Sequence, residues 1–356
     1  MQLALAQLSA HLAKGPRALY TLHGDEPLLV QEALDAIRAA IRAGAGAGDA
    51  GPAERAVYTV QGAHFDWSAV LAAGQSLSLF SGQQIVEIRI PSGKPGKEGS
   101  GALQKIAETA AGNTGTYTLV TLPRLDRQTK SGAWFAALEG NGVTIQIDPV
   151  ERAALPQWIA QRLAAQGQRV PAGEAGSRTL QFFAGRVEGN LLAAHQEIVK
   201  LGLLYPAGEL THQQVESAVL NVARYDVFKL SEAVLAGQRA RVERMLDGLQ
   251  AEGEPEVLVH YTLAEDIRAI KRVQDALAAG QPLPLALREA RVWGTRQQLL
   301  ERALLRITAT QAAGWLTAAH TVDGIIKGLP APGWPTAPWQ ALARLAQSLC
   351  AACAGR

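Results

Sequence analysis

The sequence predicts an α/β domain with a parallel sheet, followed by all-α domains. Strand-like and helix-like segments alternate over residues 17–147, and this alternation is typical of a parallel sheet with helical crossovers. After Asp148-Pro149 the strand-like segments stop, and helical periodicity continues nearly to the end of the chain. Apolar residues make up 48% of the 356 residues, which indicates a globular protein with two or three domains and an ample core.

The expected elements of the first part follow from its apolar spacing. Residues 2–14 have the spacing of a short amphipathic helix, and residues 28–42 that of a longer one. Residues 91–101 are rich in Gly, Lys and Pro and are expected to form a loop before a helix at 103–111. Asp66 is suited to cap a helix that begins beside it. The expected strands cover residues 17–22, 56–60, 85–90, 116–122 and 143–147.

The first strand, turn and helix have the order of a phosphate-binding loop but lack its residues. A Walker A loop ends in Gly-Lys-Ser/Thr, whose backbone and Lys cradle phosphates. In a pattern starting at Gly24, those three positions hold Leu29, Val30 and Gln31. The fourth strand is followed by Pro-Arg-Leu-Asp at 123–126, not by the adjacent acidic residues that would hold Mg²⁺. The sequence therefore predicts a nucleotide-binding architecture without nucleotide chemistry, and no cofactor.

Residues 75–80, Gln-Ser-Leu-Ser-Leu-Phe, lie between a predicted helix and the third strand. Leu79 and Phe80 precede a Ser-Gly break, so they are expected at the end of the helix or on the turn leaving it, where exposure is easy. One interpretation buries both side chains in the local core. The other makes them a wedge that enters a pocket on a partner, where their burial would contribute roughly 3–6 kcal/mol before ordering costs.

The charge pattern gives one candidate surface for nucleic acid. The formal net charge of +2 argues against a protein whose main task is coating nucleic acid. In residues 288–306, however, arginines outnumber acidic residues, and Arg291 and Arg296 lie on either side of Trp293. These side chains are suited to meet a phosphate backbone and to stack on a base. The alternative is a solvated or inter-subunit face.

Cysteine and histidine usage predicts neither a metal site nor catalysis. Cys350 and Cys353 form a C-x-x-C spacing without a second ligand pair, and the cysteine count is typical of a cytosolic protein. The seven histidines are scattered, so no catalytic residues are predicted. No apolar run reaches the ~18–20 residues needed to span a bilayer, and no secretory signal is apparent at the N-terminus.

Eight short segments together identify a family. They are YTLHGDEPLL at 20–29, QSLSLF at 75–80, KSGAWF at 130–135, LPQWI at 155–159, EGNLLAA at 188–194, EIVKL at 197–201, ARYDVF at 223–228 and EGEP at 252–255. In their order and spacing, the chain resembles the delta subunit of the bacterial DNA polymerase III clamp loader over essentially its whole length.

The resemblance implies three domains and a role for residues 75–80. It implies an AAA+-type α/β domain at 1–148 without a working ATP site, a helical lid at 149–210 and a helical collar at 211–356. The family binds the ring-shaped sliding clamp and holds it open for loading on primed DNA during replication. Carried over by position, the clamp contact falls on Leu79 and Phe80, with Gln75, Leu77 and Ser78 in support. This favours the wedge interpretation.

The resemblance also implies partners, location and enzymatic status. The chain is expected to be a non-catalytic subunit of the DNA polymerase III holoenzyme, whose overall activity is that of a DNA-directed DNA polymerase, a nucleotidyltransferase. Its implied partners are the sliding clamp, primed DNA, and the ATPase and delta-prime-like loader subunits, which it contacts through the collar. Its implied location is the cytoplasm, at the nucleoid or replisome. No membrane contact is expected. Two alternatives remain: a divergent AAA+ ATPase, and a protein that binds DNA directly at primer junctions with a steep salt dependence.

Overall fold

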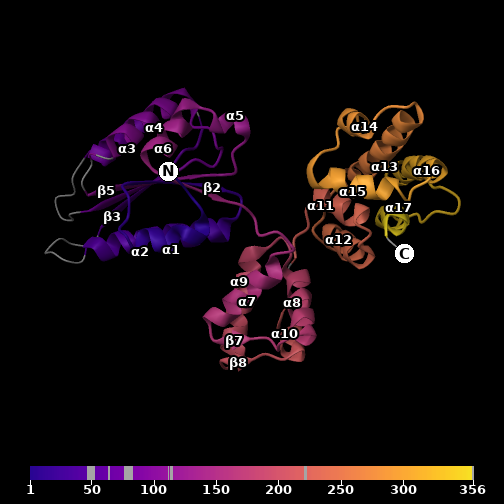
Figure 1. Ribbon diagram of the computed structural model, residues 1–356, viewed down its shortest axis with the longest axis horizontal. Coiled ribbons are helices and arrows are strands. Elements are labelled where there is room, and N and C mark those ends of the chain that lie inside the picture. The colour runs from indigo at the N-terminus through magenta and orange to yellow at the C-terminus, as the bar shows by residue number, and fades with distance from the viewer. Residues whose placement is uncertain are drawn as a thin grey trace. The chain divides into compact units, whose positions relative to one another are not determined.

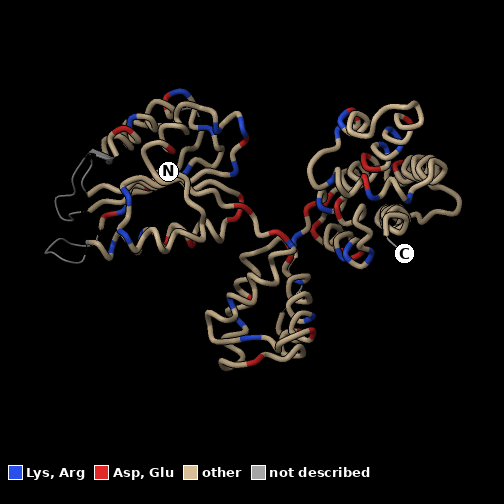
Figure 2. Tube along the Cα trace, in the orientation of Figure 1, with Lys and Arg blue, Asp and Glu red and all other residues tan. Residues whose placement is uncertain are grey.

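The structure, a computed structural model, describes residues 1–45, 53–62, 65–75, 83–110, 112, 115–219 and 223–354 (Figure 1). The chain divides into two compact units, Met1–Leu155 and Pro156–Arg356. In the parts of the chain that are described, no helix combines the length and the hydrophobicity needed to cross a membrane. Figure 2 shows basic and acidic residues interspersed along both units, in line with the formal net charge of +2.

The first unit is built on a six-stranded parallel sheet, which confirms the predicted α/β class. The strand order is β1-β6-β2-β5-β4-β3. The strands are β1 (Gln2–Leu3), β2 (Leu19–Gly24), β3 (Glu54–Thr59), β4 (Gln84–Arg89), β5 (Thr116–Leu122) and β6 (Val143–Ile147). The inner strands are buried on both faces, because helices cover both sides of the sheet (Figure 1).

Two hydrophobic cores lie on the two faces of this sheet. Successive residues of β2 alternate between them: Tyr20 and Leu22 pack on the side of α2, whereas Leu19 packs on the side of α4 and α6. One face carries the 3₁₀ helix η1 (Leu5–Gln7), α1 (Leu8–Leu12) and α2 (Pro27–Ala45). The other carries α3 (Trp67–Gln75), α4 (Gly96–Ala110), α5 (Arg127–Lys130) and α6 (Ala133–Asn141).

Two local predictions in this unit were wrong. Residues 2–14 do not form one helix, because Gln2–Leu3 is an edge strand paired in parallel with β6. A strand of two residues is too short to show an alternating apolar pattern. The helical spacing of the residues that follow therefore dominates the prediction. The expected loop at 91–101 ends early, because α4 begins at Gly96. Its glycines weaken the helix signal, but a Cβ on Gly99 would lie 2.5 Å from the ring of Trp67, so packing requires glycine there.

The second unit is almost entirely helical. Its helices are α7 (Leu155–Ala165), α8 (Glu174–Val187), α9 (Leu191–Leu204), α10 (His212–Ala218), α11 (Val227–Leu235), α12 (Arg239–Ala251), α13 (Glu256–Ala278), α14 (Leu283–Glu289), α15 (Gly294–Leu304), α16 (Ala309–Ile326) and α17 (Pro338–Cys353). The prediction that strands stop after residue 149 was wrong at one place, where β7 (Gln168–Arg169) pairs with β8 (Gly208–Glu209). Both strands are two residues long and leave no alternating pattern in the sequence.

Helices of the second unit pack in two groups. Helices α8, α9 and α10 contact one another, and Thr179 and Phe182 of α8 contact the ring of His212 in α10. Helices α11–α17 share a separate hydrophobic core that extends from Tyr225 to Cys353. The division into a lid and a collar, predicted at 149–210 and 211–356, stays a prediction.

Candidate functional site

The residues predicted to form the wedge lie at the exit of α3. Gln75 is the last residue of that helix, and Leu77, Ser78, Leu79 and Phe80 lie outside the described residues. The described chain continues at residue 83 and enters β4. The structure therefore shows what holds the two ends of the segment.

Asp66 caps the N-terminus of helix α3, as predicted. The Asp66 Oδ1 atom accepts a hydrogen bond of 2.9 Å from the backbone N–H of Ser68, which satisfies an otherwise unpaired donor at the helix start. The buried ring of Trp67 packs edge-to-face on Phe65, with centroids 5.1 Å apart. It also lies against Gly99 of α4. The beginning of α3 is thereby tied to α4.

Strand β4, which follows the wedge segment, is anchored by a buried ion cluster. The Glu87 side chain is 2% exposed and accepts hydrogen bonds of 2.6 Å from Arg38 Nε and 2.7 Å from Arg55 Nε. Burial alone would raise the pKa of Glu87, but the hydrogen bonds from Arg55 and Arg38 outweigh it and lower the pKa to about 2. The carboxylate therefore stays ionised and joins β4 to α2 and to the edge strand β3.

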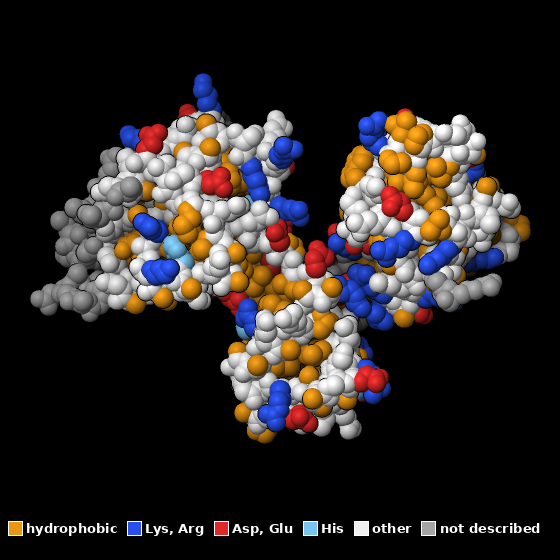
Figure 3. All heavy atoms as spheres, viewed as in Figure 1, with side chains coloured by type: hydrophobic (Ala, Val, Ile, Leu, Met, Phe, Trp, Pro, Cys, Tyr) orange, Lys and Arg blue, Asp and Glu red, His pale blue; other side chains and the backbone are white. Residues whose placement is uncertain are grey.

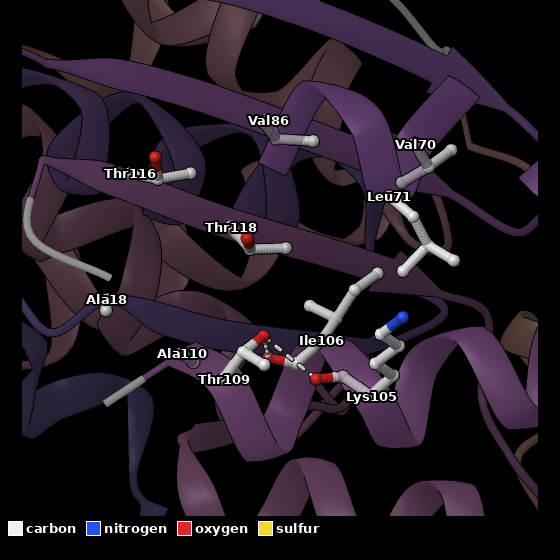
Figure 4. A pocket seen from close by; sticks show the side chains of 10 residues that line it. All are labelled: Ala18, Val70, Leu71, Val86, Lys105, Ile106, Thr109, Ala110, Thr116 and Thr118. Atoms are coloured by element: carbon white, nitrogen blue, oxygen red, sulfur yellow. Dashed lines mark hydrogen bonds between the residues drawn. The ribbon is translucent and has the colours of Figure 1, made fainter. Parts of the chain in front are cut away.

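A cavity of about 170 Å³, lined by apolar side chains together with Lys105 and threonines, lies between α3, α4 and the sheet (Figure 4). Val70 and Leu71 line it from α3, Ile106 from α4, and Val86 and Thr118 from the strands. Helix α3 thus packs closely at Trp67 and borders this cavity at Val70 and Leu71.

The side chains of the turn after β2 make local contacts. A Cβ on Gly24 would lie 1.7 Å from the carbonyl oxygen of Ile147, so the close approach of β2 and β6 requires glycine. The Asp25 Oδ1 atom accepts a 2.9 Å hydrogen bond from the backbone N–H of Arg124, after β5. Burial raises the pKa of Glu26. Two carboxyl groups, those of Asp25 and Glu26, therefore lie in this turn.

The positions that differ from a Walker A loop also have structural roles. Leu29 and Val30 pack against the core on the α2 face of the sheet. Gln31 donates a 3.1 Å hydrogen bond to Asp35. After β5, Asp126 accepts a 2.6 Å hydrogen bond from the backbone N–H of Thr129 and caps α5.

Two of the three predicted DNA-contact residues lie together on the turn between α14 and α15. The side chain of Trp293 is 63% exposed and precedes α15. Arg291 is also exposed, and its backbone φ is +56°. It is the one non-glycine residue with a left-handed φ in the part of the chain that the structure describes.

The third candidate, Arg296, is 29% exposed and pairs with a buried acidic side chain. Its guanidinium contacts Asp266 Oδ1 of α13, at 2.6 Å from Nη2 and 2.8 Å from Nε. Asp266 is fully buried, and burial raises its pKa despite the opposing charge of Arg296. This pair was not predicted from the sequence, although an acidic residue within the buried stripe of α13 is a signal for it.

The cysteines are buried in the last helix. Both thiols are free, and burial raises the pKa of Cys350 and raises that of Cys353 to about 12. In the described ranges, no group of three His, Cys, Asp or Glu side chains is placed to hold a metal ion.

Comparisons with known proteins agree on one family. The family model described as DNA polymerase III, delta subunit, matches residues 20–148. The DNA polymerase III subunit delta of Escherichia coli is 31% identical over 307 residues, covering 86% of this chain and 84% of the relative. The subunit of the same name from Haemophilus influenzae is 27% identical over 315 residues, covering 85% of this chain and 87% of the relative.

A solved structure shows the same fold. The DNA clamp loader delta protein of Bacillus subtilis superposes with a TM-score of 0.51 at 15% sequence identity, covering 97% of this chain and 99% of that protein. At 15% sequence identity, this similarity supports a shared fold and nothing further.

Proposed function

The chain belongs to the DNA polymerase III delta subunit family, and on that premise we propose that it is a non-catalytic subunit of the replicative clamp loader. It binds the sliding clamp and opens the ring for loading on primed DNA. The observation that carries the proposal is 31% identity to a delta subunit over 86% of the chain. The position of residues 75–80, at the exit of α3 and before the anchored strand β4, supports their role as the clamp contact.

The proposed mechanism is a shift of the ring's conformational equilibrium. Leu79 and Phe80 enter a pocket on the clamp, with Gln75, Leu77 and Ser78 in support. A ligand shifts a two-state equilibrium only by its differential affinity for the two states. Burial of the two side chains contributes roughly 3–6 kcal/mol. If they bound only the open ring, the ratio of open to closed ring would rise by about 10²- to 10⁴-fold.

A rigid base supports this use of binding energy. The Glu87 cluster and the packing of Trp67 fix the elements on both sides of the segment. Because these elements are already ordered in the free protein, less conformational entropy is lost when the wedge binds.

We also propose that the chain does not hydrolyse ATP, and that nucleotide acts in neighbouring loader subunits. The carboxylate of Asp25 in the turn after β2 supports this, since it would repel a phosphate. So does the core packing of Leu29 and Val30, at positions where a phosphate loop needs Gly and Lys.

Contact with primed DNA is proposed for the turn that carries Arg291 and Trp293. Several helices of the second unit, α11, α12, α13 and α16 among them, are followed by glycine in the same left-handed position, at Gly237, Gly253, Gly280 and Gly328. After α14 that position holds Arg291, which costs about 1–2 kcal/mol relative to a relaxed backbone. Strain of this kind is concentrated at functional sites, and Trp293 beside it offers an exposed ring for stacking.

The remaining assignments follow from the same proposal. The collar at 211–356 joins the ATPase and delta-prime-like subunits, the lid at 149–210 precedes it, and the complex works in the cytoplasm at the replisome. Within the holoenzyme the polymerase activity belongs to other subunits.

The experiment that tests the proposal is binding of the purified full chain to its cognate sliding clamp, measured by calorimetry. The test variant is the double alanine at Leu79 and Phe80. The matched control is Leu203→Ala with Leu204→Ala, a neighbouring pair on α9 that is 84% and 56% exposed. We expect clamp binding to be lost in the test variant alone, with both melting temperatures unchanged.

Other outcomes are equally informative. Full clamp affinity in the test variant would refute the wedge. If the wild-type chain alone does not bind, addition of the other loader subunits with ATP distinguishes a masked wedge, which then binds, from a wrong assignment, which does not.

A further inference from the structure

A groove of about 390 Å³ lies between α13 and α16 in the second unit. The two helices lie side by side in Figure 1 and run antiparallel. His260 and Gln274 of α13 bond to the carbonyl oxygens of Ala319 and Ile307, so residue numbers rise along one helix as they fall along the other. The groove therefore follows the axes of both helices.

The groove has a narrow floor of small side chains between larger walls. The floor is formed by Ala264 of α13 and Ala319 of α16, both buried. On α13, Val257 and Tyr261 stand one turn apart and are 61% and 54% exposed. Leu316 contributes to the opposite wall from α16. Small residues on the floor allow a third element to approach both helices closely.

This arrangement differs from the single apolar residues elsewhere on the surface. Figure 3 shows hydrophobic side chains exposed at several places on the second unit. Leu305 is 88% exposed and does not line the groove. Exposed apolar residues that stand singly need no explanation. Two of them on successive turns, beside a hollow lined by a second helix, are typical of a helix-binding groove.

Charges differ at the two ends of the groove. Arg268 lies at one end and is bonded to Glu265, a carboxylate that Arg272 also contacts. Two guanidinium groups thus share one carboxylate, which leaves a positive charge at this end. At the other end Asp323 is paired with Lys327. The bond to Lys327 lowers the pKa of Asp323, and His260 and His320 add to the effect.

We propose that this groove binds one amphipathic helix of a neighbouring clamp-loader subunit. The apolar face of that helix lies on Val257 and Tyr261, and an acidic side chain meets Arg268. The groove-lining residues of α13 at 257, 261, 264 and 268 recur every three or four residues, which is the spacing of a helix face against which a third helix packs. The choice of partner rests on the proposed function, in which residues 211–356 assemble with other loader subunits.

The first test is assembly of the full chain with its cognate loader subunits, measured as an affinity. The test variant is Tyr261→Lys, and the matched control is Leu305→Lys. Both replace an exposed apolar side chain of the second unit, Tyr261 within α13 and Leu305 at the C-cap of α15. We expect assembly to weaken at least about tenfold for Tyr261→Lys, because a buried aromatic anchor is typically worth that much, and to be unchanged for Leu305→Lys. Equal affinity of the two variants would overturn the proposal.

A photocrosslinking side chain in place of Tyr261 identifies the occupant. Adducts to a helix of another loader subunit support the proposal. Adducts to a second copy, to the first unit of the same chain, or to the clamp alone overturn it.

Clamp binding is measured in parallel and separates this proposal from the proposed function. If the variants bind the clamp and assembly does not depend on Tyr261, the groove assignment alone fails. If the wild-type chain neither binds the clamp nor assembles with loader subunits, the proposed function fails, and the groove's occupant fails with it.

Discussion

The ion cluster at Glu87 gives a prediction whose size can be worked out from the structure. Glu87→Gln keeps the shape of the side chain but removes the charge that faces Arg38 and Arg55. The Arg38 side chain is 5% exposed, and its remaining partner, Asp35, is 62% exposed. The exchange therefore leaves a buried guanidinium with a single surface carboxylate.

The expected loss follows from two independent arguments. The pKa of Glu87 falls from 4.5 to about 2, which corresponds to about 3 kcal/mol between the ionised and protonated forms. Breaking a buried ion pair by removing one partner typically costs about 3–5 kcal/mol. We therefore expect the free energy of unfolding of the first unit to fall by about 3 kcal/mol, or by about 6–12 °C in melting temperature.

The pH dependence has a definite sign. The folded-state pKa of Glu87 lies below its unfolded value, so its contribution is fully present above pH 4.5 and is lost as the pH falls toward about 2. Between pH 7 and pH 3.5 the wild type should lose about 1.4 kcal/mol through this residue. Glu87→Gln should not show this loss, so the two proteins should differ less at pH 3.5 than at pH 7.

The assay is urea unfolding at both pH values, with far-ultraviolet circular dichroism as the readout. The matched control is Glu54→Gln, the same exchange at an exposed position on β3 of the same sheet, and we expect it to change stability by less than about 0.5 kcal/mol. Glu87→Gln with control-like stability, or with an unchanged difference at pH 3.5, would refute the argument.

Two further predictions concern the second unit. Arg296→Met removes the ion-pair partner of the buried Asp266 carboxylate and should lower the free energy of unfolding by about 3–5 kcal/mol, measured by urea unfolding. Adding Asp266→Leu should recover most of that loss. A double variant no more stable than the single one would contradict the ion-pair account. Burial raises the pKa of Cys350 and raises that of Cys353 to about 12. Iodoacetamide at pH 8 should therefore label both thiols only as fast as the protein unfolds, measured by mass spectrometry against the urea-unfolded chain. Fast labelling of the native protein would contradict this, because it would show that the thiols are accessible.

The sheet of the first unit was predictable because its signals are strong. The strands at 116–122 and 143–147 lie at the predicted positions, since apolar β-branched runs between turn residues have few competing structures. The edge strand at Gln2–Leu3 was not predictable, because its partner is β6, more than a hundred residues away in the sequence. The start of α4 was missed because the requirement for Gly99 comes from Trp67 on another helix.

The candidate sites were predictable only in part. The missing phosphate loop can be read from residues 29–31 alone, since each side chain has the wrong chemistry. The pairing of Arg296 with Asp266 joins residues from two helices, and charge counts along the sequence do not reveal such a pair. The unusual backbone of Arg291 is equally hidden, because only the end geometry of α14 places it in the left-handed region. The clamp contact proposed for residues 75–80 rests on the sequence and the family resemblance alone.

Ring opening itself is the most direct test of the central claim. Two fluorophores placed across one interface of the cognate clamp report the open fraction by energy transfer. The account predicts that saturating wild-type chain, without ATP or other loader subunits, increases the open fraction, and that the double alanine at Leu79 and Phe80 does not. A wild-type chain that binds the clamp tightly and leaves the open fraction unchanged would contradict the account.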